Sequence, residues 1–176
     1  MDATLYLAHI RRQFRKQRSL ADRALAQIAQ EDWFIELGPR TNSLAIIMKH
    51  MAGNMRSRWR DFLTSDGEKS DRHRDTEFEL LGDDAEAIQA KWEQGWQILF
   101  DTLDALAPGD MMATITIRGE QHYVFEAIQR QIDHYAYHTG QIVLLARHLA
   151  GDDWQSLSIP KGESQAFNAA PKTYRD

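Results

Sequence analysis

Apolar side chains recur every three to four residues over most of this chain, and the recurrence predicts four long helices. The predicted helices cover residues 3–30, 42–64, 84–107 and 124–150. Each carries one broad apolar face, which is typical of helices that pack against one another. Helices of comparable length joined by shorter connections favour an all-α fold, a four-helix bundle in a single domain over residues 1–176.

Two short stretches depart from the helical pattern. Residues 113–117 alternate threonine with isoleucine, and Arg118-Gly119 supplies a turn before residues 120–123. This alternation predicts a small β-hairpin between the third and fourth helices. Residues 65–82 are polar and show no period, so they predict a long loop, and loops of this length are usually functional or mobile.

The ends of the third helix and of the chain carry further signals. Asp83 with Glu86 has the spacing of a capping box, which would begin the third helix. The tail, residues 151–176, carries Trp154, Leu157 and Ile159. These three apolar side chains predict a tail docked on the bundle.

The second helix has two surfaces to bury. One is a broad apolar face, and at about 100° per residue His50 lies well off its centre, in an apolar setting of its own. Either surface can face the core and leave the other for a partner subunit.

Composition limits which partners the chain can bind and which residues can carry out its chemistry. The net charge of −5 argues against nucleic acid as a partner. The chain has neither a signal-peptide pattern nor an apolar run of about 18 residues, so we expect no membrane span and a cytoplasmic location. It contains no cysteine. Any metal must therefore bind to His, Asp or Glu, and any thiol chemistry must use a thiol supplied by another molecule.

His134 and His138 form the strongest candidate for chemistry. Four residues apart on a helix, their Cβ atoms lie about 6 Å from each other, so both imidazoles can reach one ion. No glutamate follows His134, which excludes the metalloprotease form of the motif. His50 is the best third ligand, although His50 taken alone is more typical of a core histidine bonded to a carbonyl.

The remaining histidines fit a shared site less well. His148 lies about 15 Å beyond His138 along the helix axis, and His9, His73 and His122 read as surface residues. Three imidazoles without a fourth protein ligand leave an open coordination position, as catalytic zinc sites do. Imidazole also suits nickel, iron and copper, so the metal is not determined.

Asn54 and Gln141 follow His50 and His138 by one helical turn. Each is placed to orient a ligand or to face a substrate. No residue is identified as catalytic from the sequence.

The chain resembles the DinB-like superfamily, in particular the bacillithiol-transferase-like four-helix bundles, and is closest to an uncharacterised, conserved branch. Members typically carry one histidine on the second helix and an HxxxH pair on the fourth. The segments that carry the resemblance are Lys49-His50-Met51-Ala52-Gly53-Asn54, Arg56-Ser57-Arg58-Trp59, Asp66-Gly67-Glu68-Lys69, Arg74-Asp75, His134-Tyr135-Ala136-Tyr137-His138-Thr139-Gly140-Gln141, Ser158-Ile159-Pro160-Lys161-Gly162-Glu163-Ser164 and Phe167-Asn168.

The resemblance implies a divalent metal, most often zinc or nickel, held by His50, His134 and His138, and a homodimer. Characterised relatives are bacillithiol or mycothiol S-transferases and the mycothiol-dependent maleylpyruvate isomerase, in which the metal activates a low-molecular-weight thiol. The function expected here is therefore a metal-dependent thiol transferase. Carboxylates of a small-molecule thiol would be held by arginines, with these candidates: Arg56, Arg58, Arg72 and Arg74.

Three alternatives stay open at the level of sequence. A metal-dependent hydrolase would use the same ligands, but the sequence identifies no Asp or Glu as its general base. A non-catalytic, stress-related dimer would bind a metal or a ligand without turnover. The third alternative is a helical bundle with three buried neutral histidines.

Overall fold

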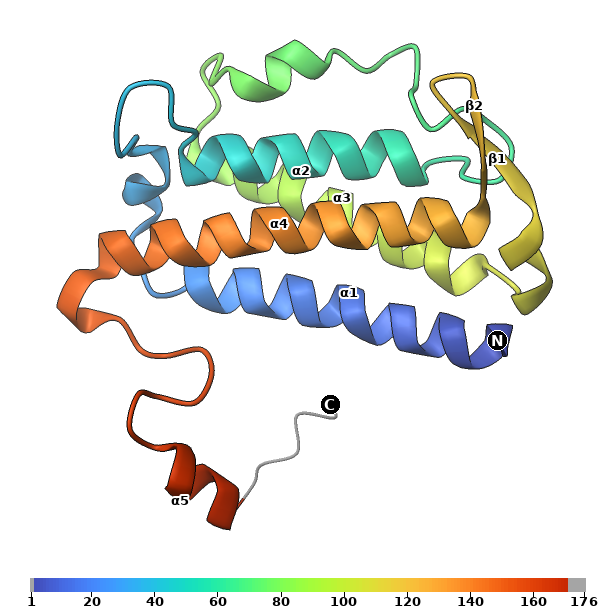
Figure 1. The fold of residues 1–176 in the computed structure, drawn as a ribbon. Helices are drawn as coiled ribbons and strands as arrows, with labels where there is room; N and C mark the ends of the chain where they lie inside the picture. The colour runs from blue at the N-terminus through green and yellow to red at the C-terminus, as the bar shows by residue number, and fades with distance from the viewer. Residues whose placement is uncertain (1, 171–176) are drawn as a thin grey trace.

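The computed structural model describes residues 2–170 and is mostly helical, with one two-stranded antiparallel hairpin (Figure 1). The helices and strands have these bounds: α1 Ala3–Leu25, α2 Leu44–Trp59, α3 Ala85–Ala105, β1 Thr114–Ile117, β2 Glu120–Tyr123, α4 Val124–Ala150 and α5 Ser164–Ala169. Short 3-10 helices lie between them: η1 Gln30–Phe34, η2 Arg74–Phe78, η3 Pro108–Met112 and η4 Gly151–Asp153. The predicted hairpin is confirmed, with Ile115 opposite His122.

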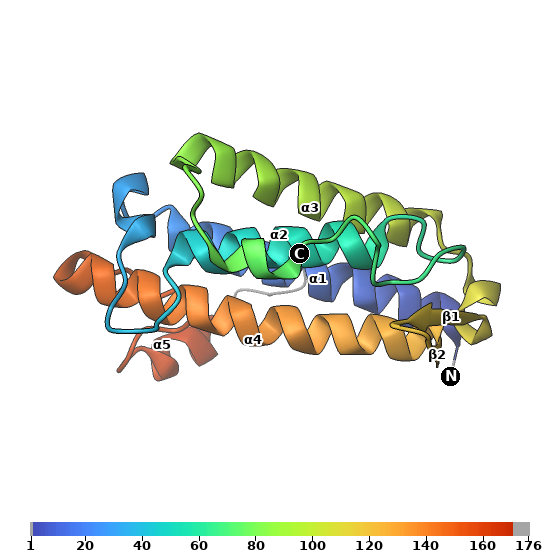
Figure 2. The ribbon, with the colours of Figure 1, turned by 90° about the horizontal axis from the view of Figure 1, so that it is seen from above.

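The four long helices lie side by side, with α2 against α3, α1 against α4, and α2 also against α4 (Figures 1 and 2). Aromatic side chains fill the space between them. Phe14 packs edge-on against Trp59 with ring centroids 5.5 Å apart, and Trp96 packs similarly against Tyr135. No helix among residues 2–170 has the length and apolar character that crossing a bilayer would require.

Two helices end earlier than the pattern predicts. α1 ends at Leu25 and not at residue 30, and α2 ends at Trp59 and not at residue 64. Arg60 is extended and Asp61 has a φ of 49°, so the backbone leaves the α conformation there. Phe62 is nevertheless buried and stacks on Trp59 at 5.1 Å. The apolar period continues past the helix because this side chain still packs into the core.

The capping box predicted at Asp83 is wrong. The N-cap of α3 is Asp84, whose carboxylate accepts a hydrogen bond from the Ala87 amide at 2.8 Å. Asp83 instead pairs with Lys49 at 2.6 Å and with Lys91. Asp83 thus connects α2 to α3 through ion pairs with a lysine of each helix.

The segment between α2 and α3 runs back along α2, and its 3-10 helix η2 packs on that helix (Figure 2). Sequence reasoning assigned no structure here. Because η2 covers the surface that carries His50, this histidine is only 5% exposed. Both surfaces of α2 are therefore buried within one chain, and the expectation that one of them is left for a partner subunit is wrong.

Part of the tail docks as predicted. Trp154 and Leu157 pack against the core, and the Gln155 amide donates to the Gln27 side chain at 2.7 Å. Beyond them the chain turns away and forms α5, which projects from the four long helices in Figure 1. Residues 171–176 of the predicted tail lie outside the described residues.

Candidate metal centre

His50 on α2 and the pair His134 and His138 on α4 meet between the two helices. The Nε2 atom of His134 lies 3.3 Å from that of His50 and 3.0 Å from that of His138. All three residues offer ligand atoms within 4.8 Å of one another. The three imidazoles thus point to one place.

The spacing of these nitrogens suits a metal ion. Zinc–nitrogen bonds of about 2.0–2.1 Å in a tetrahedral site put neighbouring ligand atoms about 3.3–3.4 Å apart. The two separations at His134 are close to that edge length. The three histidines can therefore hold one ion after small adjustments of their rings.

Glu77 sets the proton position on His50. Its Oε2 lies 2.9 Å from His50 Nδ1, and both side chains are buried. Burial alone would raise the pKa of this carboxyl, but hydrogen bonds from His50 and Arg72 outweigh it and hold the pKa below its usual value. An ionised carboxylate only accepts hydrogen bonds. The Nδ1 atom is therefore the donor, and the Nε2 lone pair is left for a metal.

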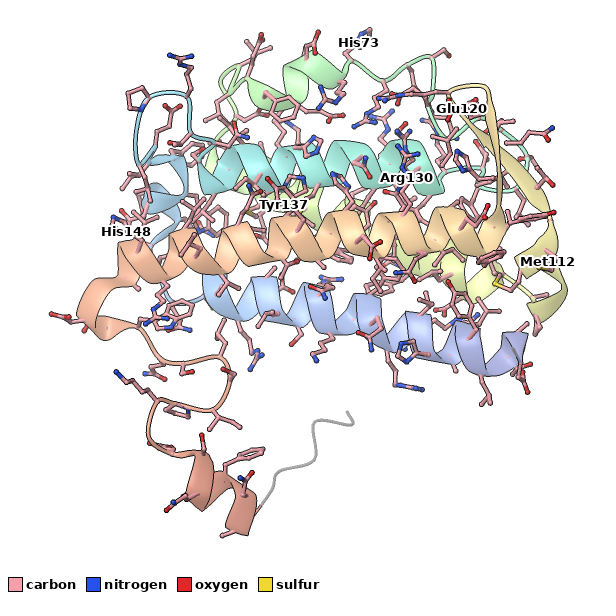
Figure 3. All side chains as sticks on the ribbon, in the orientation of Figure 1. His73, Met112, Glu120, Arg130, Tyr137 and His148 are labelled. Carbon is pink, nitrogen blue, oxygen red and sulfur yellow. The ribbon has the colours of Figure 1, made fainter. Side chains whose placement is uncertain are left out.

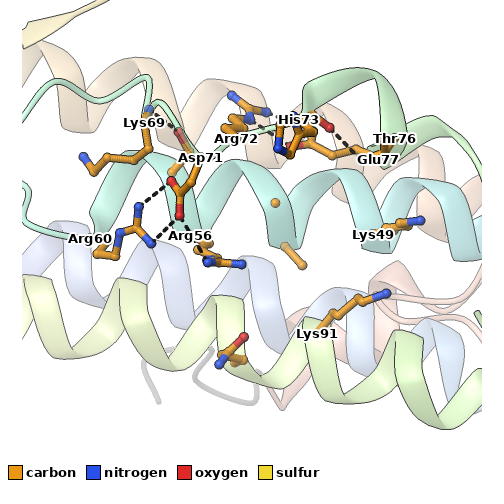
Figure 4. A pocket seen from close by; sticks show the side chains of 14 residues that line it. Lys49, Arg56, Arg60, Lys69, Asp71, Arg72, His73, Thr76, Glu77 and Lys91 are labelled. Atoms are coloured by element: carbon orange, nitrogen blue, oxygen red, sulfur yellow. Dashed lines mark hydrogen bonds and ion pairs between the residues drawn. The ribbon is translucent and has the colours of Figure 1, made fainter.

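Arg72 and Gly53 hold Glu77 in this position. The Arg72 guanidinium donates to both carboxylate oxygens, at 2.8 and 2.9 Å, which gives a bidentate ion pair (Figure 4). On α2, a Cβ atom at Gly53 would lie 2.5 Å from Glu77 Oε1. The glycine thus creates the space that lets the carboxylate reach His50.

Gln141 plays the same part for His138. Its Oε1 lies 2.7 Å from His138 Nδ1, and its Nε2 donates to the Tyr137 hydroxyl at 3.1 Å. With the amide oxygen as acceptor, Nδ1 carries the proton and Nε2 is free to bind a metal. Two of the three imidazoles are thus fixed in the tautomer that a metal needs.

The imidazoles of the α4 pair are held neutral. Burial, reinforced by the neighbouring imidazoles of His138 and His50, lowers the pKa of His134 to about 3. Burial is also the largest cause that lowers the pKa of His138. Metal ligation requires unprotonated imidazole, so both residues are ready to bind at neutral pH.

A cavity of about 190 Å³ opens beside this centre. Its lining includes two of the ligands, His50 and His134, together with Asn54 and five arginines. A second cavity of about 250 Å³ is lined in part by Arg72 and Glu77 (Figure 4). The three ligand histidines do not line it, so the smaller cavity is the approach to the centre.

The candidate binding residues on α2 line two different cavities. Asn54 lines the smaller cavity and accepts a hydrogen bond from the buried Tyr135 hydroxyl at 2.9 Å. Arg58 also lines that cavity; it is 5% exposed and donates to Glu68 at 3.0 Å. Arg56 pairs with Asp71 at 3.3 Å on the wall of the larger cavity (Figure 4).

The other histidines stay apart from the centre. His148 is exposed near the C-terminal end of α4, well away from Tyr137 (Figure 3). His9 and His73 are exposed, and His122 is half-buried in the hairpin. Within residues 2–170, the cluster able to hold a metal ion consists of His50, His134 and His138.

Sequence reasoning missed several residues at the site, among them Glu77 and Arg130. Glu77 lies in a patternless loop, and no local signal links it to His50. Arg130, which lines the smaller cavity, precedes His134 by one helical turn. The spacing of four residues places Arg130 on the same helix face as His134 and His138, so the sequence alone could have identified it.

Fold and site together define a mostly helical protein with a partly buried three-histidine cluster that can hold a metal ion. Residues 2–163 match the family described as "Protein of unknown function (DUF1572)", and the chain belongs to this family. Neither the curated proteins nor the solved structures include a match to the chain.

Proposed function

We propose that this protein is a DinB-like four-helix bundle that binds a divalent metal, zinc or nickel, and transfers a low-molecular-weight thiol to an electrophile. One observation carries the proposal. The Nε2 atoms of His50, His134 and His138 converge, while Glu77 and Gln141 hold the Nδ1 protons of two of them. Such partners are typical of metal-bound histidines.

The chain's own residues account for binding and orientation. Three protein ligands leave a position open for a small molecule, as in catalytic zinc sites. A divalent ion held there would lower the pKa of a thiol that reaches it. Glu77 and Gln141 keep the imidazoles in place, and Asn54 offers an amide at the cavity wall.

The thiol must come from another molecule, since the chain contains no cysteine. The smaller cavity supports this assignment, because Arg58, Arg72 and Arg74 line it beside the imidazoles. Guanidinium groups bind carboxylates strongly. A thiol that carries carboxylates can therefore enter with its sulfur toward the histidines.

A hydrolase is less well supported. A metal-dependent hydrolase commonly needs a carboxylate or histidine base at hydrogen-bonding distance from the attacking water. Among the described residues that line the smaller cavity there is no Asp or Glu. Glu77 is near, but His50 and Arg72 already occupy both of its oxygens.

Metal content tests the first half of the proposal. Protein purified without added metal is analysed for its elements, alongside the variants His134→Ala and His148→Ala. We expect about one zinc or nickel per chain in the wild type and in His148→Ala, and little in His134→Ala. Equal metal in both variants would show that the three histidines do not form the site.

Thiol transfer tests the second half. Zinc-loaded and chelator-treated protein are assayed with a panel of small thiols and a chromogenic electrophile. Conjugation that requires zinc and is lost in His134→Ala supports a transferase. A protein that holds zinc yet accelerates no conjugation would instead be a non-catalytic metal-binding protein.

A homodimer is also proposed. Its support is the resemblance together with exposed apolar side chains on α4, where Tyr137 and Leu144 lie seven residues apart and are 63% and 68% exposed. Light scattering at micromolar concentration measures the mass directly. A mass of 20.3 kDa would refute the dimer.

A further inference from the structure

The cavity beside the three histidines is strongly cationic. Its arginines come from four separate parts of the chain and are these: Arg58, Arg72, Arg74, Arg118 and Arg130. Among the described residues, two carboxylates pair with them. Glu68 pairs with Arg58, Arg72 and Arg118, and Glu77 pairs with Arg72.

Two of the arginines have no carboxylate partner among the described residues. Arg74 lies over the Phe78 ring at 4.9 Å, and no ion pair neutralises it. Arg130 makes no hydrogen bond or ion pair within residues 2–170; it stands on the side of α4 that faces α2 (Figure 3). Both guanidiniums therefore line the same cavity, one from η2 and one from α4.

A buried amide lines the same cavity. Gln131 lines the cavity, is only 3% exposed, and its side chain has no hydrogen-bond partner among the described residues. A buried polar group without a partner costs free energy, so such a group marks a place where a ligand or water completes the bonding. The unpartnered atom is Oε1, which accepts hydrogen bonds; a half-turn of the amide would put its NH2 group in that place, and that group can donate to an anion.

From these three observations, we infer that the cavity is a subsite for a small dianionic group, a phosphate or a pair of neighbouring carboxylates, bridged between Arg74 and Arg130. The inference deepens the proposed function and rests on it, because it gives the charge of a reactant at the same centre. A single negative charge would leave one guanidinium unpaired, whereas a dianion satisfies both.

Calorimetric titration of the full chain tests the subsite. Inorganic phosphate and succinate are titrated separately into metal-free and zinc-loaded protein at low salt. The same titrations are made with Arg130→Gln and with Arg147→Gln, a matched control. Arg147 is an exposed arginine of the same helix, about 25 Å farther along its axis.

We expect one anion per chain, bound at least about tenfold more weakly by Arg130→Gln than by the wild type, with Arg147→Gln unchanged. Arg74→Gln is expected to weaken binding as Arg130→Gln does. Whichever probe binds more tightly identifies the dianion as phosphate-like or dicarboxylate-like. Equal affinities in the Arg130 and Arg147 variants, or no saturable binding of either probe, would overturn the inference and leave an adventitious ion only.

The titration separates this inference from the proposed function. Anion binding by metal-free protein does not depend on thiol transfer. Specific binding without zinc-dependent conjugation would overturn the transferase alone. Conjugation in the wild type without specific anion binding would overturn the subsite alone.

Discussion

Gly53 lies where the α2 backbone comes closest to the Glu77 carboxylate, and replacing it with alanine isolates the contribution of Glu77 to metal binding. The new Cβ would lie 2.5 Å from Glu77 Oε1 and 2.7 Å from its Cδ, well inside the 3.4 Å at which ordinary contact begins. Arg72 donates hydrogen bonds to both carboxylate oxygens, and the Glu77 side chain is buried. The carboxylate therefore cannot relieve the clash by rotating freely to another position.

The size of the effect follows from these distances. Relief of the clash moves the carboxylate by about 1 Å, which takes a 2.9 Å hydrogen bond to His50 beyond the usual limit of about 3.2 Å. Loss of such a partner typically lowers metal affinity about 10–100-fold. That range corresponds to about 1.4–2.8 kcal/mol of binding free energy.

Gly140→Ala is the matched control. Gly140 also lies in a helix beside the site, on α4, and a Cβ there would meet nothing within 4 Å. Alanine is favoured over glycine in a helix by about 1 kcal/mol. We therefore expect Gly140→Ala to raise the melting temperature without changing zinc affinity, and Gly53→Ala to lower zinc affinity without that gain in stability.

Zinc affinity is measured by competition with a chromophoric chelator, and folding by circular dichroism. If Gly53→Ala binds zinc as tightly as the wild type and Gly140→Ala, Glu77 does not orient His50 in solution. The Glu77 carboxylate would then not fix the tautomer of the His50 imidazole.

Two further predictions concern a ligand and the acid stability of the fold. His138→Ala is expected to lose metal but keep its helical signal, because the aromatic core does not include the imidazole; loss of helicity in this variant, or on chelation, would make the ion structural. Burial is the largest single influence on the Asp66 carboxyl and raises its pKa, but hydrogen bonds from the backbone amides of Glu68, Gly119 and Arg118 together outweigh it and lower the pKa from 3.8 to about 2. The folded state thus binds this proton less readily than the unfolded state, so the contribution to stability is complete above about pH 4 and is lost as the pH falls toward 2. Urea unfolding of Asp66→Asn between pH 2 and pH 5 should show a smaller loss on acidification than the wild type, and identical pH profiles would contradict the assignment.

The helices and the candidate ligands follow from local rules, and for that reason they could be read from the sequence. A period of about 3.6 residues identifies buried faces, and a spacing of four places His134 and His138 side by side. His50 could be proposed as the third ligand because it lies off the apolar face of its own helix. The structure brings the three together.

What the sequence did not reveal depends on packing between distant segments. Glu77 meets His50 across 27 residues, through a 3-10 turn that has no apolar period. The early end of α2 was hidden because Phe62 continues the period from outside the helix. Arg130 is different, since its position one turn before His134 was available to the same spacing rule.

The segment that carries Glu77 and Arg74 belongs to neither of the helices that supply the candidate metal ligands. Ion binding at the histidines and docking of this segment on α2 are therefore coupled. Docking would raise the affinity for the ion by some factor, and ion binding would favour docking by the same factor. An occupied centre would slow amide exchange in η2, and any molecule that pulls η2 away would release the ion. A metal ion held by the three histidines would thus respond to a molecule that binds η2 at the protein surface, without contact between that molecule and a histidine.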